Sequence, residues 1–149
     1  MSECIILPDN TKEWRLNGNL HREDGPAIEF TSGSKHWYQN GRFHREDGPA
    51  IEKADGTNYW YKNGERHRLE GPAIEWSSGT KHWYQNGVRH REDGPAADYI
   101  SGTMYWFLNG EKLSEDFFNK VTKGPVKDLP LYLGQRFDDY IANRLKSNE

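Results

Sequence analysis

The sequence predicts an all-β protein, an antiparallel β-meander of repeated hairpins with a helical C-terminal cap. Three observations support this fold class. A heptapeptide that begins His-Arg recurs at a constant step of 23 residues, at His21, His44, His67 and His90. Tryptophan and the pair Asn-Gly keep the same step. After the last copy, the repeat stops and apolar residues take helical spacing. A period of this length without gaps indicates stacked copies of one supersecondary unit.

One repeating unit extends from Pro26 to Pro49, and its sequence predicts short strands joined by turns. Asn40-Gly41 is a strong hairpin signal, because both residues tolerate the positive φ of a type I′ turn. The aromatic-rich residues 35–39 before it and residues 42–46 after it are expected to form its two strands. Residues 27–30 are expected to form another short strand, and residues 31–34 to turn back to the next aromatic strand.

Side chains alternate between the two faces of a strand, so Trp37 and Gln39 are expected on one face and His36 and Tyr38 on the other. Because the register repeats, we expect a ladder of Trp rings on one face and a row of Tyr and Phe rings on the opposite face. If the Trp face is the core, each Trp is more buried than the Tyr that follows it. These pairs are Trp37 and Tyr38, Trp60 and Tyr61, and Trp83 and Tyr84.

The chain divides into an N-terminal cap segment (residues 1–13), the hairpin repeats (14–112) and a helical C-terminal cap (113–149). Ser114 is a good N-cap and acidic residues follow it, so a helix is predicted from about Glu115 to Thr122. A second, amphipathic helix is predicted over residues 131–146. Both end segments are expected to cover the edges of the sheet, because an open edge invites aggregation.

Composition limits the partners and the compartment. The net charge of −3 gives no reason to expect duplex nucleic acid or an anionic membrane as a partner. The single cysteine, Cys4, excludes an internal disulfide and favours a reducing compartment. No long apolar stretch occurs, so we expect a soluble cytoplasmic protein. Aromatic residues on both faces of a sheet need cover that 149 residues do not easily supply, which predicts a homodimer.

The recurring Trp-Tyr-Gln-Asn-Gly and His-Arg-Glu-Asp-Gly-Pro-Ala segments resemble the MORN-like repeats of uncharacterised phage and large-virus proteins. Those repeats combine an aromatic residue, a Gly turn and a short hairpin, and the resemblance covers Trp14 to Gly110. This chain departs from the standard MORN pattern, which has further glycines where His-Arg-Glu-Asp stands here. The closing segment at 109–118 also resembles the end of such viral arrays. The resemblance implies a hairpin fold and a viral origin, with a host cytoplasm as the compartment.

The His-Arg-Glu-Asp segment has a structural interpretation. Each Arg is expected to pair with a Glu or Asp of the neighbouring copy, and each His to pack on a Trp or Tyr ring. Such surface ion pairs contribute only about 0–1 kcal/mol each, but repetition makes networks of them. Identical residues in every copy are what a stacked architecture requires. The arginines concerned are Arg22, Arg45, Arg68 and Arg91.

The same segment also has a ligand-binding interpretation. Arg and His donors beside aromatic rings are typical of sites that bind a phosphate and a base. The candidate residues are Arg45, Arg68, Arg91, His44, His67, His90, Tyr38, Tyr61 and Tyr84. Such rows predict a protein that sequesters a nucleotide-type immune signal, as an alternative to one that binds a host protein.

An enzyme using the His, Glu and Asp side chains is the third interpretation. Catalysis needs one constellation with distinct roles, whereas here every group recurs, and the third copy has Leu69 and Glu70 in place of Glu and Asp. No metalloprotease, redox, nucleophile-elbow or phosphate-loop motif occurs. We therefore expect no catalytic residue, metal or cofactor. The sequence favours a non-enzymatic viral accessory protein that binds a host protein.

Overall fold

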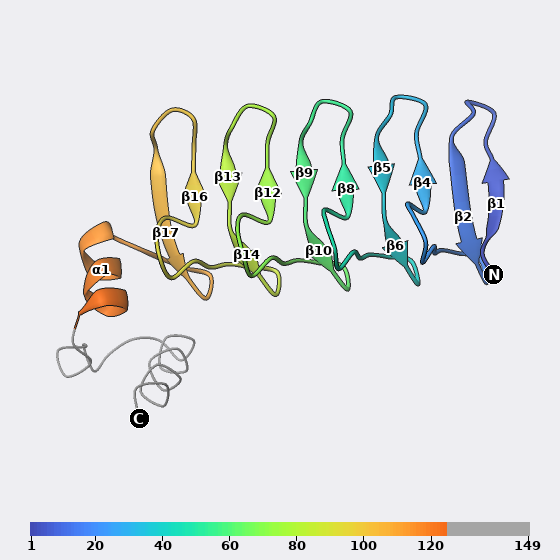
Figure 1. Ribbon diagram of the computed structural model, residues 1–149. Helices are drawn as coiled ribbons and strands as arrows, with labels where there is room; N and C mark the ends of the chain where they lie inside the picture. Colours follow the sequence, from blue (N-terminus) through green and yellow to red (C-terminus); the bar gives the residue numbers. More distant parts are fainter. Residues whose placement is uncertain (125–149) are drawn as a thin grey trace.

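The computed structural model describes residues 1–124, and the predicted helix over residues 131–146 lies outside them. Five tall hairpins stand side by side, and the chain passes along the row from one hairpin to the next (Figure 1). They join into one 12-stranded antiparallel sheet. The predicted hairpin array with a C-terminal helix is confirmed.

Eight of the twelve strands in the large sheet have only two residues. In spatial order the strands of the sheet are β1 (Glu3–Ile6), β2 (Lys12–Leu16), β4 (Ile28–Glu29), β5 (Lys35–His36), β8 (Ile51–Glu52), β9 (Asn58–Tyr59), β12 (Ile74–Glu75), β13 (Lys81–His82), β16 (Ala97–Asp98), β17 (Met104–Leu108) and β18 (Glu111–Leu113). A short strand beside this path, β3 (Asn19–Leu20), pairs with β2.

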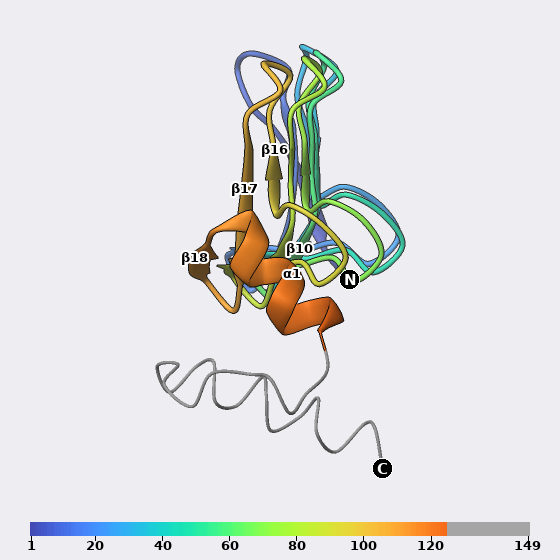
Figure 2. The same ribbon diagram turned by 90° about the vertical axis from the view of Figure 1, so that its left-hand side faces the viewer.

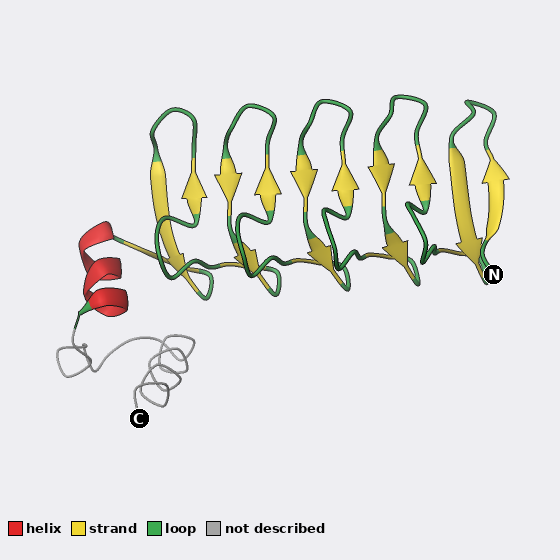
Figure 3. Ribbon diagram, viewed as in Figure 1, coloured by secondary structure: helices red, strands yellow, loops and turns green. Residues whose placement is uncertain are grey.

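Small hairpins lie at the base of the tall ones (Figure 3). They are β6 (Tyr38–Gln39) with β7 (Arg42–Phe43), β10 (Tyr61–Lys62) with β11 (Glu65–Arg66), and β14 (Tyr84–Gln85) with β15 (Val88–Arg89). In the first, Asn40 has φ 50° and Gly41 has φ 75°. Positive φ at both central residues is the type I′ geometry that Asn-Gly predicted.

The predicted strand over residues 35–39 is broken at Trp37. The Trp37 amide donates to the carbonyl of Ala50 at 2.8 Å, and the Trp37 carbonyl accepts from the amide of His44 at 3.1 Å. Its two backbone groups therefore serve different partners, so β5 belongs to the large sheet and β6 to a small hairpin. The returning strand also ends earlier than predicted, at Phe43, and the His-Arg-Glu-Asp segment that follows is a loop.

The two faces of the large sheet differ in chemistry. Directly paired residues of an antiparallel sheet share a face, so the register assigns each residue to one face or the other. One face alternates aliphatic and aromatic side chains: Ile28, His36, Ile51, Tyr59, Ile74, His82, Ala97 and Tyr105. The other face is charged or polar: Lys12, Glu29, Lys35, Glu52, Asn58, Glu75, Lys81 and Asp98. Opposite charges oppose each other across most of this second row, which favours the observed register.

The core is built on alanine and isoleucine rather than on tryptophan. The alanines that follow the Gly-Pro turns are 0% exposed, namely Ala27, Ala50, Ala73 and Ala96. Trp83 is only half-buried while Tyr84 is 9% exposed, so the expectation that each Trp is more buried than its Tyr is wrong for this pair. The Trp83 ring instead lies against the Arg91 guanidinium, 4.0 Å from its carbon, and lines an open cleft between two loops.

The C-terminal end of the array is closed by α1 (Glu115–Lys123), as predicted (Figure 2). The Ser114 side chain accepts a hydrogen bond from the Phe117 amide at 3.3 Å, which is the expected N-cap. Phe118 and Val121 are 0% exposed and pack on Leu108. At the N-terminal end, the segment expected to act as a cap supplies β1, which extends the sheet by one strand.

Candidate functional site

The loop formed by His-Arg-Glu-Asp holds its arginine on the adjacent tryptophan. The Arg45 guanidinium carbon lies 4.0 Å from the centroid of the Trp37 ring. The Arg45 Nε donates to Asp47 at 2.8 Å and its Nη1 to Glu52 at 2.7 Å. A Cβ at Gly48 would come within 2.9 Å of the guanidinium carbon, so a side chain there would displace the arginine from this position. The arginine is thus enclosed by ring, loop and carboxylates.

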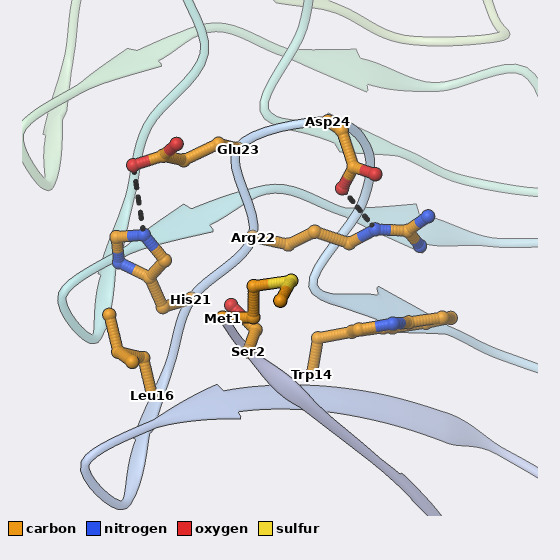
Figure 4. A pocket seen from close by; sticks show the side chains of 8 residues that line it. All are labelled: Met1, Ser2, Trp14, Leu16, His21, Arg22, Glu23 and Asp24. Carbon is orange, nitrogen blue, oxygen red and sulfur yellow. Dashed lines mark hydrogen bonds and ion pairs between the residues drawn. The ribbon is translucent and has the colours of Figure 1, made fainter.

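The same arrangement recurs at Arg22, Arg68 and Arg91, each with its guanidinium carbon 4.0 Å from a Trp centroid. Figure 4 shows the first copy, with Arg22 lying flat above Trp14 and reaching Asp24. The third copy has Leu69 directly after the arginine and Glu70 two positions after it, and Arg68 keeps the contact to Glu75 at 3.0 Å. In each copy the arginine is half-buried.

We predicted that these arginines pair with carboxylates of the neighbouring copy, and the structure shows this pairing together with a contact inside the loop. Arg45 binds Asp47 of its own loop and Glu52, which lies after Pro49 and therefore in the next copy. Hydrogen bonding to Arg45 lowers the pKa of Asp47, and Arg22 and Arg91 act in the same way on the pKa of Asp24 and Asp93. A phosphate would have to displace these carboxylates to reach the guanidinium groups.

The histidine of each loop ties one repeat to the next. The backbone amide of Asn63 donates to Nδ1 of His44 at 3.2 Å, and Nε2 of His44 lies 3.2 Å from a carboxylate oxygen of Glu46. Nδ1 of His44 also lies 2.9 Å from the side-chain oxygen of Asn63, so this ring nitrogen contacts both the backbone and the side chain of Asn63. The bond from the Asn amide recurs at His21, His67 and His90. The sequence analysis predicted that these histidine rings pack on Trp or Tyr. It did not predict the hydrogen bond from the asparagine of the next repeat.

Open clefts lie between successive loops. The cleft between the first and second loops has a volume of about 550 Å³ and is lined by residues 22–25 and 44–47 together with Trp37 and Gln39. The shared lining confirms that Trp37 and Gln39 point to the same side. Its two arginines face four carboxylates, those of Glu23, Asp24, Glu46 and Asp47. The excess of negative charge disfavours a phosphate in this cleft.

The predicted tyrosines belong to a different surface from the arginines and histidines of the loops. Tyr38 packs on Phe43 with 4.2 Å between ring centroids, and Phe43 packs on Tyr61 of the next copy at 5.1 Å. The Tyr38 and His36 rings are 6.4 Å apart, which confirms that these two residues share a face. The nine candidate residues therefore do not form one site. They divide into arginine–tryptophan stacks, histidine links between repeats, and tyrosines on the small hairpins.

The tyrosines form one continuous row with side chains that the sequence analysis did not select. We call it the hairpin row. Its members are Tyr38, Phe43, Tyr61, Arg66, Tyr84, Arg89, Phe107 and Lys112, which pair within the small hairpins and between β17 and β18. The sequence did contain a signal for these arginines. The residue before each loop histidine is Arg in two copies, and strand alternation places that residue opposite the tyrosine.

Arg66 and Arg89 connect successive aromatic rings of the hairpin row. Arg66 donates from Nε to the Tyr61 hydroxyl at 3.3 Å, and its guanidinium carbon lies 5.3 Å from the Tyr84 ring centroid. Arg89 donates to the Tyr84 hydroxyl at 3.0 Å and lies 5.2 Å from the Phe107 ring. Among residues 1–124, neither guanidinium forms an ion pair with a carboxylate. Both arginines are half-buried.

His82 lies in the apolar row of the large sheet, near both of these arginines. It is 5% exposed and packs between Trp76 and Tyr99, with ring centroids 4.5 and 5.1 Å away. Its Nε2 is buried and has no hydrogen-bond partner in the described part of the chain. Burial lowers the pKa of His82 to about 4, and the positive charges of Arg89 and Arg66 act in the same direction. The ring is therefore neutral at physiological pH.

Comparison with known proteins adds no assignment. No protein-family model matches the chain, and no curated protein matches it. The likeness to MORN-like arrays stays a prediction, beyond the repeated antiparallel hairpins that the structure shows. Within residues 1–124, no helix is long and apolar enough to cross a membrane.

Proposed function

We propose that the protein is a non-enzymatic binding protein that engages a partner protein through the hairpin row. The observation that carries the proposal is the position of Arg66 and Arg89, which lie on aromatic rings with no carboxylate partner among the described residues. Aromatic residues and arginine are the types most enriched at protein interfaces and among their strongest contacts. A row of them along one side of a rigid array offers several equivalent contacts at once.

The chemistry of the row indicates the chemistry of the partner. A guanidinium group binds a carboxylate through two parallel hydrogen bonds, and this geometry gives specificity as well as affinity. The rings of Tyr38, Phe43 and Tyr61 are half-exposed and need an apolar surface to cover them. The partner surface is therefore expected to carry Asp or Glu side chains beside apolar ones.

The loop side of the array supports a non-enzymatic role. Arg45 is held by a ring and two carboxylates, and His44 is held by the next repeat. These groups stabilise the stacking and are not arranged around a common reacting centre, as catalysis requires. The resemblance to repeats of phage and large-virus proteins is the basis for proposing that the partner is a host factor and the protein a viral accessory protein.

The experiment compares Arg66→Glu/Arg89→Glu with a matched control, Arg42→Glu. Arg42 is exposed and lies opposite Gln39, on the other face of its small hairpin. Each immobilised protein is incubated with host lysate, and retained proteins are quantified by mass spectrometry after circular dichroism has confirmed the fold. We expect the wild type and Arg42→Glu to retain the same acidic protein and the double variant to lose it. Equal retention by the wild type, Arg42→Glu and the double variant would refute the proposal.

A nucleotide-type ligand is the second candidate, and one observation favours it. His82 has a buried Nε2 without a partner in the described chain, and Arg66 and Arg89 lie close enough to lower its pKa. A bound phosphate would offset that positive charge, while the neighbouring aromatic rings could stack on a base. In this form the protein would sequester a nucleotide-type immune signal, through residues other than the loop arginines.

Tryptophan fluorescence tests this second candidate, because the Trp76 ring lies 4.5 Å from His82. Cyclic and linear nucleotides are titrated at low and high salt into the wild type and into Arg89→Lys. Binding at this cluster would quench fluorescence in the wild type, and the lysine variant would bind more weakly because it cannot form the paired guanidinium contacts. The absence of any change at millimolar nucleotide would eliminate this candidate and leave the protein partner.

A further inference from the structure

The outer strand of the array, β1, has every side chain exposed. Its four residues pair with β2 on one side, in the register Cys4 to Trp14 and Ile5 to Glu13. No strand of the described chain pairs with its other side. Ile5 is 43% exposed and Ile6 is 65% exposed, which places two aliphatic side chains at the open edge.

The direction of the free backbone groups follows from the hydrogen bonds of β1. The Leu7 amide donates to the Thr11 carbonyl at 2.9 Å, so Leu7 and Thr11 are a hydrogen-bonded pair. Such pairs alternate along an antiparallel ladder, so Ile5 and Glu3 also direct their amides and carbonyls toward β2. Cys4 and Ile6 therefore direct theirs outward, away from β2.

The C-terminal end of the sheet is covered by a helix, whereas the N-terminal end is an open strand edge. At the C-terminal end, Phe118 and Val121 of α1 are fully buried against Leu108. At the N-terminal end, β1 contains no lysine, proline or bulge, which are the usual devices that protect an edge strand from pairing. Its single charge is that of Glu3. An apolar edge with outward backbone donors and acceptors is a template for another strand.

We propose that β1 pairs with β1 of a second copy of the chain, antiparallel, about a two-fold axis at Ile5. The pairing is isologous, because the same strand serves both copies. In this register, Cys4 of each copy exchanges two hydrogen bonds with Ile6 of the other, which uses all the outward groups of β1. The two sheets then continue into each other, and the dimer carries two hairpin rows.

Two neighbouring symmetric registers fit less well. An axis at Ile6 places Pro8 opposite Cys4, and Pro8 has no amide to donate. An axis at Cys4 places the Glu3 carboxylate opposite Ile5 and needs Ser2, which lies outside β1. The axis at Ile5 instead places Ile5 opposite Ile5, which continues the apolar row of the large sheet across the interface.

The register can be tested by disulfide formation in a Cys4→Ser background. Non-hydrogen-bonded residues facing each other lie at a Cα separation of about 4.5 Å, within the range that a disulfide spans. Ile5→Cys is therefore expected to give a cross-linked dimer on mild oxidation. The matched control is Glu3→Cys, whose residue faces Leu7 of the second copy and is expected to remain uncross-linked. Equal cross-linking of both variants, or of neither, would overturn the proposed register.

Assembly is tested separately by sedimentation of the otherwise unaltered chain and of Ile6→Pro. Ile6 is exposed and its amide points outward, so the substitution removes an intermolecular donor while the β1–β2 ladder keeps its bonds. The wild type is expected to sediment as a dimer at tens of micromolar, and Ile6→Pro as a 17.4 kDa monomer. A monomeric wild type, or a proline variant that stays dimeric, would overturn the proposal. Neither result bears on the hairpin row, so the two proposals are tested independently.

Discussion

Replacing His44 by Ala removes one of the hydrogen bonds that join successive repeats. His44 is 9% exposed and its Nδ1 accepts from the Asn63 amide at 3.2 Å. A backbone donor left without its partner costs about 1–3 kcal/mol, with the lower end expected here because Asn63 is exposed and water can reach it. Loss of the packed imidazole adds to this cost. We therefore expect the free energy of unfolding to fall by about 1–3 kcal/mol, measured by urea denaturation.

The matched control is His44→Asn, since the Asn Oδ1 stands where the His Nδ1 stood and can accept the same amide. It should retain about 1 kcal/mol of stability relative to His44→Ala. Hydrogen exchange gives a local measurement, because the Asn63 amide is expected to exchange faster in His44→Ala and to stay protected in His44→Asn. If both variants lose equal stability and exchange alike, the histidine does not act as the acceptor that joins the repeats.

The remaining predictions concern pH, packing and the helical cap. His82, whose pKa is lowered from 6.5 to about 4 in the folded state, holds fewer protons there than when unfolded, so stability is complete above pH 6.5 and falls toward pH 4, by about 3 kcal/mol in total. His82→Tyr, which copies Tyr59, should flatten the stability difference between these pH values in calorimetry. Ala73→Leu should cost about 1–3 kcal/mol by overpacking a fully buried site, whereas Ala54→Leu at an exposed turn should cost little, as denaturant midpoints would show. Phe118→Ala should cost about 3–5 kcal/mol and expose the last hairpin to protease, and an unchanged digestion pattern would contradict the capping role of α1.

The repeat and its turns could be predicted from the sequence because their causes are local. The fixed step of 23 residues indicates a stacked array, and Asn40-Gly41 indicates a type I′ hairpin regardless of its surroundings. Ser114 and the acidic residues after it likewise mark the start of α1. Side-chain alternation also placed Trp37 and Tyr38 correctly on opposite sides of the backbone.

Other features depend on contacts between distant residues, and the sequence did not reveal them. Propensity treats residues 35–39 as one strand, whereas the strand breaks at Trp37 because its amide finds Ala50. From the sequence, the loop arginines are candidates for ligand binding. In the structure, Arg45 instead donates hydrogen bonds to Asp47 and Glu52. Arg66 was overlooked because its role depends on Tyr84 of the next copy, and its position before the loop histidine indicates only that it faces Tyr61.

The histidine links have a consequence for the length of the molecule. Each spans 19 residues, from a loop histidine to the asparagine of the following turn, and is repeated at every junction. Removal of residues 44–66 would join Phe43 directly to His67, and every remaining junction would find the partner it has now. Insertion of a further unit would be accommodated in the same way. The length of the array is thus set by copy number, and a gene that gains or loses whole units changes the length of the hairpin row while each histidine link keeps its form.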